Sequence, residues 1–158
     1  MSKVPIRLVF AGDLYLGGDF LRVADETDRD YLDPFRKVEP FFSGIDIGFI
    51  NLEGPTFITK SLKPKVTIHL SNHPRALEFC SRNQLTVLSL ANNHILDFGV
   101  EALQKTVHAI TESGLTPIGV SGNEEEISQP TTVNCRGWKI GFFSLMAFPR
   151  LDEEPVIE

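Results

Sequence analysis

The sequence has little cysteine and no excess of basic charge. Its two cysteines, Cys80 and Cys135, belong to no CxxC or Cys/His zinc pattern, so a disulfide framework or a structural zinc site is not indicated. The chain has 15 basic and 21 acidic residues, a formal net charge of -6, and its charges are mixed. It therefore lacks the basic stripe that neutralises a phosphate backbone, which argues against nucleic acid as a partner.

Long hydrophobic runs are missing as well. The apolar run near the N-terminus ends at Gly12-Asp13 and is too short for a signal-peptide core or a membrane span. The chain as written is therefore expected to be soluble, and membrane association would need segments outside it. Its 158 residues, with 42% hydrophobic and 23% charged content, predict one globular domain over residues 1–158.

Short apolar runs alternate with helical patterns, which predicts the α/β fold class. Strands are expected at residues 6–11, 46–50, 85–90 and 115–120, with a short one at 66–69, and helices at residues 33–44, 73–80 and 97–113. Residues 131–135 and 138–143 predict a C-terminal β-hairpin turned at Arg136-Gly137. The order implies a mainly parallel sheet with flanking helices and the antiparallel hairpin at one margin.

Polar side chains follow the first three predicted strands. Asp13 comes after the first, Glu53 after the second, and Asn93 and His94 after the third. Taken singly, each has another reading, because acids and amides often serve turns or helix caps and a single histidine is often structural; Asp97 is the clearest candidate for a cap. Since parallel strands end at one edge of a sheet, we expect the loops to converge there as a site.

Oxygen donors with few nitrogens and no thiolates suit Mg²⁺ or Mn²⁺, and they leave Zn²⁺ and Fe open. A carboxylate between two cations can bridge them, and a metal pair can hold a phosphate oxygen and activate a water. His94, beside an asparagine and close to two acids, is a candidate ligand or acid catalyst. The sequence therefore predicts a divalent-metal site with one or two ions.

Three motifs, in the order AGDLYLGG, INLEGP and SLANNHILDFGVEALQKTVHAITESG, resemble the capsule-synthesis (CapA-type) poly-γ-glutamate biosynthesis family. This family is a branch of the calcineurin-like metallophosphoesterases, and the resemblance runs from Val9 to Leu145. It implies a metallophosphoesterase-like half-domain and a metal-dependent phosphoesterase-like hydrolase of capsule or poly-γ-glutamate synthesis. Family members are often associated with the cell envelope.

The resemblance also implies roles for four residues. Asp13 would bind one metal, Glu53 would be the bridging carboxylate, Asn93 would bind the second metal, and His94 would be the phosphate-facing acid. The superfamily often has a histidine two residues after the first aspartate, and Tyr15 stands at that position here.

Family members continue into a second half that carries further histidines, including a Gly-His-His-Pro-His-like segment, which this sequence does not contain. The remaining histidines His69, His73 and His108 do not match those positions and are expected to be structural or exposed. The implied metal site is therefore partial, with weak or no occupancy in this chain alone.

Two functions follow. The first is the metal-dependent hydrolase, and the alternative is a catalytically inactive truncated domain that acts as an interaction or self-associating module. The expected partner is a second copy or another chain that completes the site, with the contact near Phe142-Phe143 through Phe148-Pro149. For Phe142 and Phe143, filling the domain's own core is the other reading. A nucleotide-binding domain is disfavoured because no glycine-rich phosphate loop follows a strand.

Overall fold

The structure, a computed structural model, describes residues 4–59, 68–121 and 129–146. Its elements are, in order, β1 (Leu8–Leu14), α1 (Asp19–Thr27), the 3₁₀ helices η1 (Asp33–Phe35) and η2 (Glu39–Phe42), β2 (Ile47–Leu52), α2 (Arg75–Arg82), β3 (Val87–Ser89), α3 (Gly99–Glu112), β4 (Thr116–Ile118), β5 (Thr131–Cys135) and β6 (Trp138–Phe142). Four parallel strands, flanking helices and a C-terminal antiparallel hairpin confirm the predicted α/β fold.

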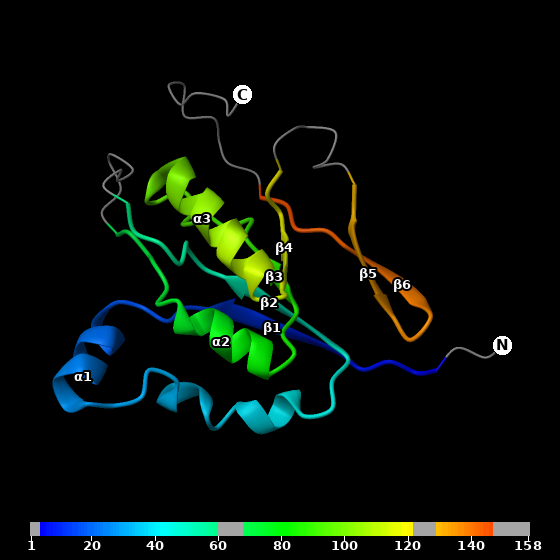
Figure 1. Ribbon diagram of the computed structural model, residues 1–158, viewed down its shortest axis with the longest axis horizontal. Coiled ribbons are helices and arrows are strands. Elements are labelled where there is room, and N and C mark those ends of the chain that lie inside the picture. Colours follow the sequence, from blue (N-terminus) through cyan, green and yellow to red (C-terminus); the bar gives the residue numbers. More distant parts are fainter. Residues whose placement is uncertain (1–3, 60–67, 122–128, 147–158) are drawn as a thin grey trace.

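The parallel sheet has the strand order β1-β2-β3-β4, so neighbours in sequence are neighbours in space. Helices α2 and α3 lie on one side of it (Figure 1). The main core lies between these helices and the sheet, and its fully buried members include Leu52, Phe79, Leu88, Leu90 and Ile110. The sheet is thereby covered on this face.

The hairpin β5-β6 forms a separate two-stranded sheet, so the prediction that it extends one margin of the parallel sheet is wrong. Strand β4 at that margin is three residues long and has Pro117 at its centre, which has no N–H to donate to another strand. The hairpin packs on the other face of the sheet instead, where Phe142 joins a second buried cluster with Ile47, Val87 and Ile118.

Strand β1 extends further than predicted and ends at Leu14, so Asp13 lies inside the strand and not in the loop after it. The pairing of β1 with β2 shifts in register between Phe10 and Asp13, and it resumes with Asp13 opposite Asn51. Such an irregularity reorients the side chains that follow it. It places Asp13 beside the end of β2.

Residues 33–44 form two 3₁₀ turns in place of the predicted helix. Pro40 has no N–H, and its ring would clash with the preceding turn of an α-helix. The segment is nevertheless anchored, because the ring of Phe35 lies 4.5 Å from that of Phe79 on α2. Helix α1 was not predicted: its apolar stripe is short and no side chain caps it.

The C-terminal helix α3 matches its prediction closely, whereas the predicted cap does not. The N-cap position of α3 is Phe98, and no side chain makes a capping hydrogen bond there. The carboxylate of Asp97 binds Leu70 and His94 instead. Of the predicted short strand at 66–69, residues 66 and 67 lie outside the described residues, and residues 68 and 69 have no strand structure.

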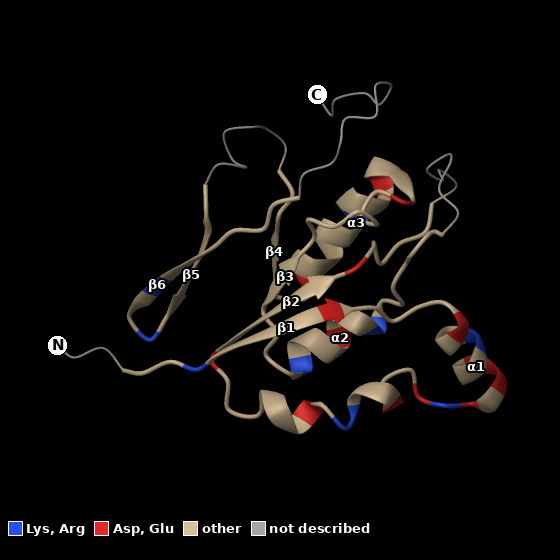
Figure 2. Cartoon of the chain, turned by 180° about the vertical axis from the view of Figure 1, so that it is seen from behind, with Lys and Arg blue, Asp and Glu red and all other residues tan. Residues whose placement is uncertain are grey.

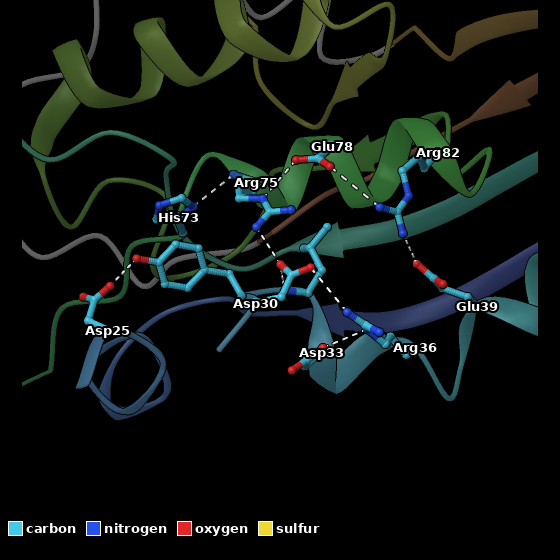
Figure 3. A network of polar contacts seen from close by, with 11 residues as sticks. Asp25, Asp30, Asp33, Arg36, Glu39, His73, Arg75, Glu78 and Arg82 are labelled. Atoms are coloured by element: carbon cyan, nitrogen blue, oxygen red, sulfur yellow. Dashed lines mark hydrogen bonds and ion pairs between the residues drawn. The ribbon is translucent and has the colours of Figure 1, made fainter. Parts of the chain in front are cut away.

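An ion-pair network joins α2 to the segment before β2 (Figure 3). Arg75 Nη1 lies 2.6 Å from Asp30 Oδ1, and Arg75 Nε lies 3.0 Å from Glu78 Oε2. At the other end of α2, Arg82 pairs with Glu39. These contacts hold the 3₁₀ turns against the helix.

The histidines outside the candidate site have structural or exposed positions, as predicted. The ring of His73 lies 4.4 Å from that of Tyr31, and its Nδ1 accepts a hydrogen bond from the backbone N–H of Arg75. Burial, reinforced by the charge of Arg75, lowers the pKa of His73 below its ordinary value of 6.5. His69 is half-buried and His108 is exposed on α3.

Acidic positions gather on α1, at the end of the molecule beyond the carboxyl end of β1, whereas basic positions are scattered (Figure 2). Within the part of the chain that the structure describes, no helix is long and apolar enough to cross a membrane.

Candidate active site

Three neighbouring strand ends deliver the predicted site residues to one edge of the sheet. Asp13 lies opposite Asn51 in the pairing of β1 with β2, and Asn51 lies opposite Ser89 in the pairing of β2 with β3. Glu53 follows β2 directly, and its backbone N–H donates to the carbonyl of Leu14, the last residue of β1. The parallel topology therefore produces the convergence that the sequence predicted.

Asp13 and the turn after β3 are connected through two asparagines. Asn51 Nδ2 donates to Asp13 Oδ1 at 2.8 Å, and Asn92 Nδ2 donates to Asn51 Oδ1 at 3.2 Å. Asn92 is buried, whereas Asp13 is exposed. Asp13 thus has one oxygen held by a hydrogen bond, and its other oxygen accepts none from the residues that the structure describes.

His94 lies between two carboxylates. Its Nδ1 is 2.7 Å from Asp97 Oδ2, and its Nε2 is 4.0 Å from Glu53 Oε1. Asp97 is 1% exposed, and its Oδ2 also accepts the backbone N–H of Leu70 at 2.9 Å. A buried carboxylate at Nδ1 fixes the orientation of an imidazole and leaves Nε2 directed at the site.

Asn72 ties the loop after β1 to the loop after β2. Its side chain is 4% exposed, and its Oδ1 accepts the backbone N–H of Leu16 at 2.7 Å. Its Nδ2 donates to the carbonyls of Glu53 at 2.7 Å and Gly54 at 3.2 Å. The backbone of Glu53 is therefore held from the side of α2 as well as from β1.

Gly54 is required where the chain turns after Glu53. Its φ is 85°, and a Cβ at this position would lie 2.6 Å from the carbonyl oxygen of Leu70. This close approach brings the chain before α2 against the site loops. A side chain at position 54 would push Leu70 away, together with its hydrogen bond to Asp97.

Tyr15 stands at the edge of the site. A Cβ on Gly17 would lie 2.6 Å from the Tyr15 ring, so the ring packs over this glycine. Burial, then the nearby charges of Glu53 and Asp19, raise the pKa of the Tyr15 phenol. The phenol is therefore a neutral hydrogen-bond donor at neutral pH.

Asn93 is exposed, and its side chain makes no hydrogen bond within the described residues. Among those residues, no three of histidine, cysteine, aspartate and glutamate lie close enough together to hold a metal ion. The oxygen donors that could meet a cation at this edge are one oxygen of Asp13, the Asn93 carboxamide and the carboxylate of Glu53, whose Oε1 lies 4.0 Å from His94 Nε2. This set suits a hard cation that keeps water or substrate oxygens in its shell.

The sequence indicated Asp13, Glu53, Asn93 and His94 as site residues, whose roles stay predictions, but not the side chains that contact them. No role was predicted for Asn51, Asn72 or Asn92, and Asp97 was interpreted as a cap. Asn51 and Asn92 did carry a signal, because each stands at the end of a strand. Asn72 carried none, since its partners are 18 to 56 residues away in the sequence.

Comparison with known proteins identifies the relatives of this chain. It is 26% identical to the capsule biosynthesis protein CapA of Bacillus anthracis over 138 residues, which cover 85% of this chain and 33% of that protein. It is 30% identical to the PGA biosynthesis protein CapA of Bacillus subtilis (strain 168) over 111 residues, which cover 70% of this chain and 29% of that protein.

The chain therefore spans about a third of the length of these relatives. The family described as bacterial capsule synthesis protein PGA_cap matches residues 7–156, nearly the whole sequence. With the three strand-end loops in place, this match shows that the chain belongs to the PGA_cap family of bacterial capsule synthesis proteins.

Proposed function

We propose that this chain provides the metal-dependent, phosphoesterase-like site of a protein of capsule or poly-γ-glutamate synthesis. The observation that carries the proposal is the position of His94 between the buried carboxylate of Asp97 and the carboxylate of Glu53. In its imidazolium form, a histidine anchored at Nδ1 also carries a proton on the open Nε2 and can donate it to a leaving alkoxide.

Asp13, Glu53 and Asn93 are the residues that would hold a divalent cation. Their oxygens suit Mg²⁺ or Mn²⁺, and the imidazole nearby also admits Zn²⁺ or Fe. A bound cation supplies positive charge that stabilises a phosphate oxygen and an attacking water. Because these residues fill only part of a coordination shell, the affinity of this chain alone is weak.

His94 is the residue that would protonate the leaving oxygen. Water attacks phosphorus and keeps one proton on the new phosphate oxygen, the bond from phosphorus to the leaving oxygen breaks, and the imidazolium form of His94 gives its Nε2 proton to the leaving oxygen. The second proton of the water passes to solvent, from which Nε2 is protonated again. Asp97 stabilises the resulting arrangement by accepting from Nδ1 throughout. Tyr15, at the edge of the site, can donate its phenol hydrogen to an anionic substrate.

The proposal is tested by release of inorganic phosphate from glycerol 2-phosphate, whose leaving group is an alkoxide, with Mn²⁺, comparing His94→Ala with His108→Ala. His108 is exposed on α3 and serves as the matched control. Loss of a general acid typically lowers the rate by about 10²- to 10⁴-fold. Equal rates for the two variants, or rates that do not depend on Mn²⁺, would contradict the proposal.

A second candidate function is self-association, and the exposed aromatic surface on β1 favours it. Phe10 is 65% exposed, although its ring lies 5.7 Å from that of Phe49 and 6.5 Å from that of Phe142. Leu8, on the same side of the strand, is also exposed. Phe142 itself fills the core, whereas Phe143 is 57% exposed, and Phe148-Pro149 lies outside the described residues.

We propose a second copy of the chain as the partner of this surface. Strand β1 is at the edge of the sheet and, within the described residues, pairs only with β2. A second copy offers the same open edge and the same ring, and a two-fold axis would bring the two surfaces together. A different chain that completes the site could bind the same face. The mass of the complex distinguishes such a partner from a second copy.

Sedimentation velocity at micromolar concentration tests this second function. The wild-type chain is expected to sediment as a dimer and Phe10→Lys as a monomer, while Val100→Lys, at an exposed position on α3, should leave the dimer intact. A wild-type monomer would rule out self-association.

A further inference from the structure

The side chain of Asn92 uses its whole hydrogen-bonding capacity inside the protein. It is 7% exposed, and its Oδ1 accepts the backbone N–H groups of Gly54 at 3.3 Å and His94 at 3.2 Å. Its Nδ2 donates to the backbone carbonyl of Leu52 at 2.9 Å and to Asn51 Oδ1 at 3.2 Å. One carboxamide thus joins the ends of β2 and β3.

The direction of these hydrogen bonds is fixed by the backbone. An N–H can only donate and a carbonyl can only accept, so the carboxamide of Asn92 cannot be turned over without losing three bonds. Asn51 must therefore offer its oxygen to Asn92. Its Nδ2 is then left to face Asp13, to which it donates at 2.8 Å.

This direction determines what Asp13 presents to the site. Asp13 is exposed and follows a register shift in β1, so its backbone surroundings alone leave the carboxylate free to rotate. The hydrogen bond from Asn51 holds Oδ1 and leaves Oδ2 available. A prearranged ligand loses less side-chain entropy when it binds.

We propose that Asn92 and Asn51 form a directional hydrogen-bond relay that aims Asp13 at the cation, so that both are positioning residues although neither is a ligand. The inference rests on the proposed metal site. It goes beyond that site because it makes metal affinity depend on a buried side chain in the loop after β3, whereas Asp13 lies in β1.

A charge-based account makes the opposite prediction for one variant. Asn92→Asp adds a negative charge near the site, which by itself would strengthen cation binding. In the relay, however, an aspartate at position 92 cannot donate to Asn51 or to the Leu52 carbonyl. Asn51 would have to turn its Nδ2 toward position 92, and its oxygen would then face the Asp13 carboxylate.

The experiment measures Mn²⁺ affinity from the electron paramagnetic resonance signal of the free ion, without any turnover. Asn51→Leu keeps the volume of the side chain and removes the middle of the relay. Residues that orient metal ligands typically change affinity by about 10- to 100-fold when replaced. We expect a loss in this range for Asn51→Leu and for Asn92→Asp. Ile118→Val, on the opposite face of the sheet, controls for a small loss of stability.

Four outcomes are distinguished. Weaker Mn²⁺ binding by both relay variants with unchanged binding by Ile118→Val supports the relay. Wild-type affinity in Asn51→Leu, or tighter binding in Asn92→Asp, overturns it while leaving the proposed metal site standing. If Asn92→Asp does not fold, the result for Asn51→Leu alone decides. A wild-type chain that binds no Mn²⁺ at millimolar concentration overturns the metal site itself, and the relay with it.

Discussion

Asn72 holds two of the site loops through one buried carboxamide, so replacing it with leucine should destabilise the fold strongly. Leucine has a similar size and cannot form hydrogen bonds. The substitution would leave three backbone groups without a partner: the N–H of Leu16 and the carbonyls of Glu53 and Gly54. The hydrogen bond from the backbone N–H of residue 72 to Pro55 would remain.

The size of the effect follows from these three groups. A buried polar group that loses its partner costs about 1–3 kcal/mol. The Leu16 N–H is deeply buried and should cost most, whereas water can reach the carbonyl of the half-buried Glu53, and the bond to Gly54 is the longest of the three at 3.2 Å. We therefore expect a loss of about 3–6 kcal/mol, a large part of the ~5–15 kcal/mol that stabilises a typical domain.

Urea denaturation followed by circular dichroism measures this loss. Asn83→Leu is the matched control, because Asn83 is half-buried and donates a single hydrogen bond, to the carbonyl of Phe79 at 2.9 Å. That variant should lose about 0.5–1.5 kcal/mol. If Asn72→Leu and Asn83→Leu lose free energies of unfolding that agree within about 1 kcal/mol, the claim that Asn72 supports three backbone groups is refuted.

Three further predictions concern the packing around α2. Phe79 is 1% exposed, so Phe79→Ala should lower the free energy of unfolding by about 3–5 kcal/mol, whereas Phe41→Ala, at a 74% exposed position, should change it by less than about 0.5 kcal/mol. Because the pKa of His73 is lowered, the unfolded chain binds a proton that the folded chain excludes, so the free energy of unfolding should fall as the pH drops below about 6.5. His73→Phe should remove part of this pH dependence, whereas the control His108→Phe should not. Burial raises the pKa of the Cys80 thiol to about 12, so a native-state thiol titration at pH 8 should label the other cysteine alone, and rapid labelling of both would contradict the packing of α2.

The sequence was sufficient to predict the sheet and the convergence of its loops, because both depend on local patterns. Apolar runs gave β2, β3 and β4, and the period of three and four gave α3. Polar residues directly after the apolar runs placed Glu53 and His94 beyond the carboxyl ends of β2 and β3. Parallel topology then placed the loops at one edge without any knowledge of side-chain contacts.

The support for the site could not be predicted, because it depends on contacts between distant residues. Asn92 and Asn93 are neighbours of the same type, yet the first is buried with four hydrogen bonds and the second is exposed. Nothing local in the sequence distinguishes them. Asp97 has the position of a helix cap, and only the fold shows that its carboxylate binds His94 and Leu70.

The hairpin was predicted only in part. Its two strands and its turn at residues 136–137 were predicted correctly. Its placement was not, because alternation along a strand identifies an apolar face but not the surface that covers it. Here Pro117 offers no N–H at the edge of the parallel sheet, and the hairpin packs on the face of the sheet opposite α2 and α3.

The central claim is that the carboxyl end of β1 and the loops after β2 and β3 bind one divalent cation together. Paramagnetic broadening of backbone amide signals by substoichiometric Mn²⁺ tests it directly, because this method detects weak binding. We predict that broadening begins at residues 12–13, 51–53 and 92–94 and is lost in Glu53→Gln. Broadening centred on the acidic helix α1, or none at millimolar Mn²⁺, would contradict the account.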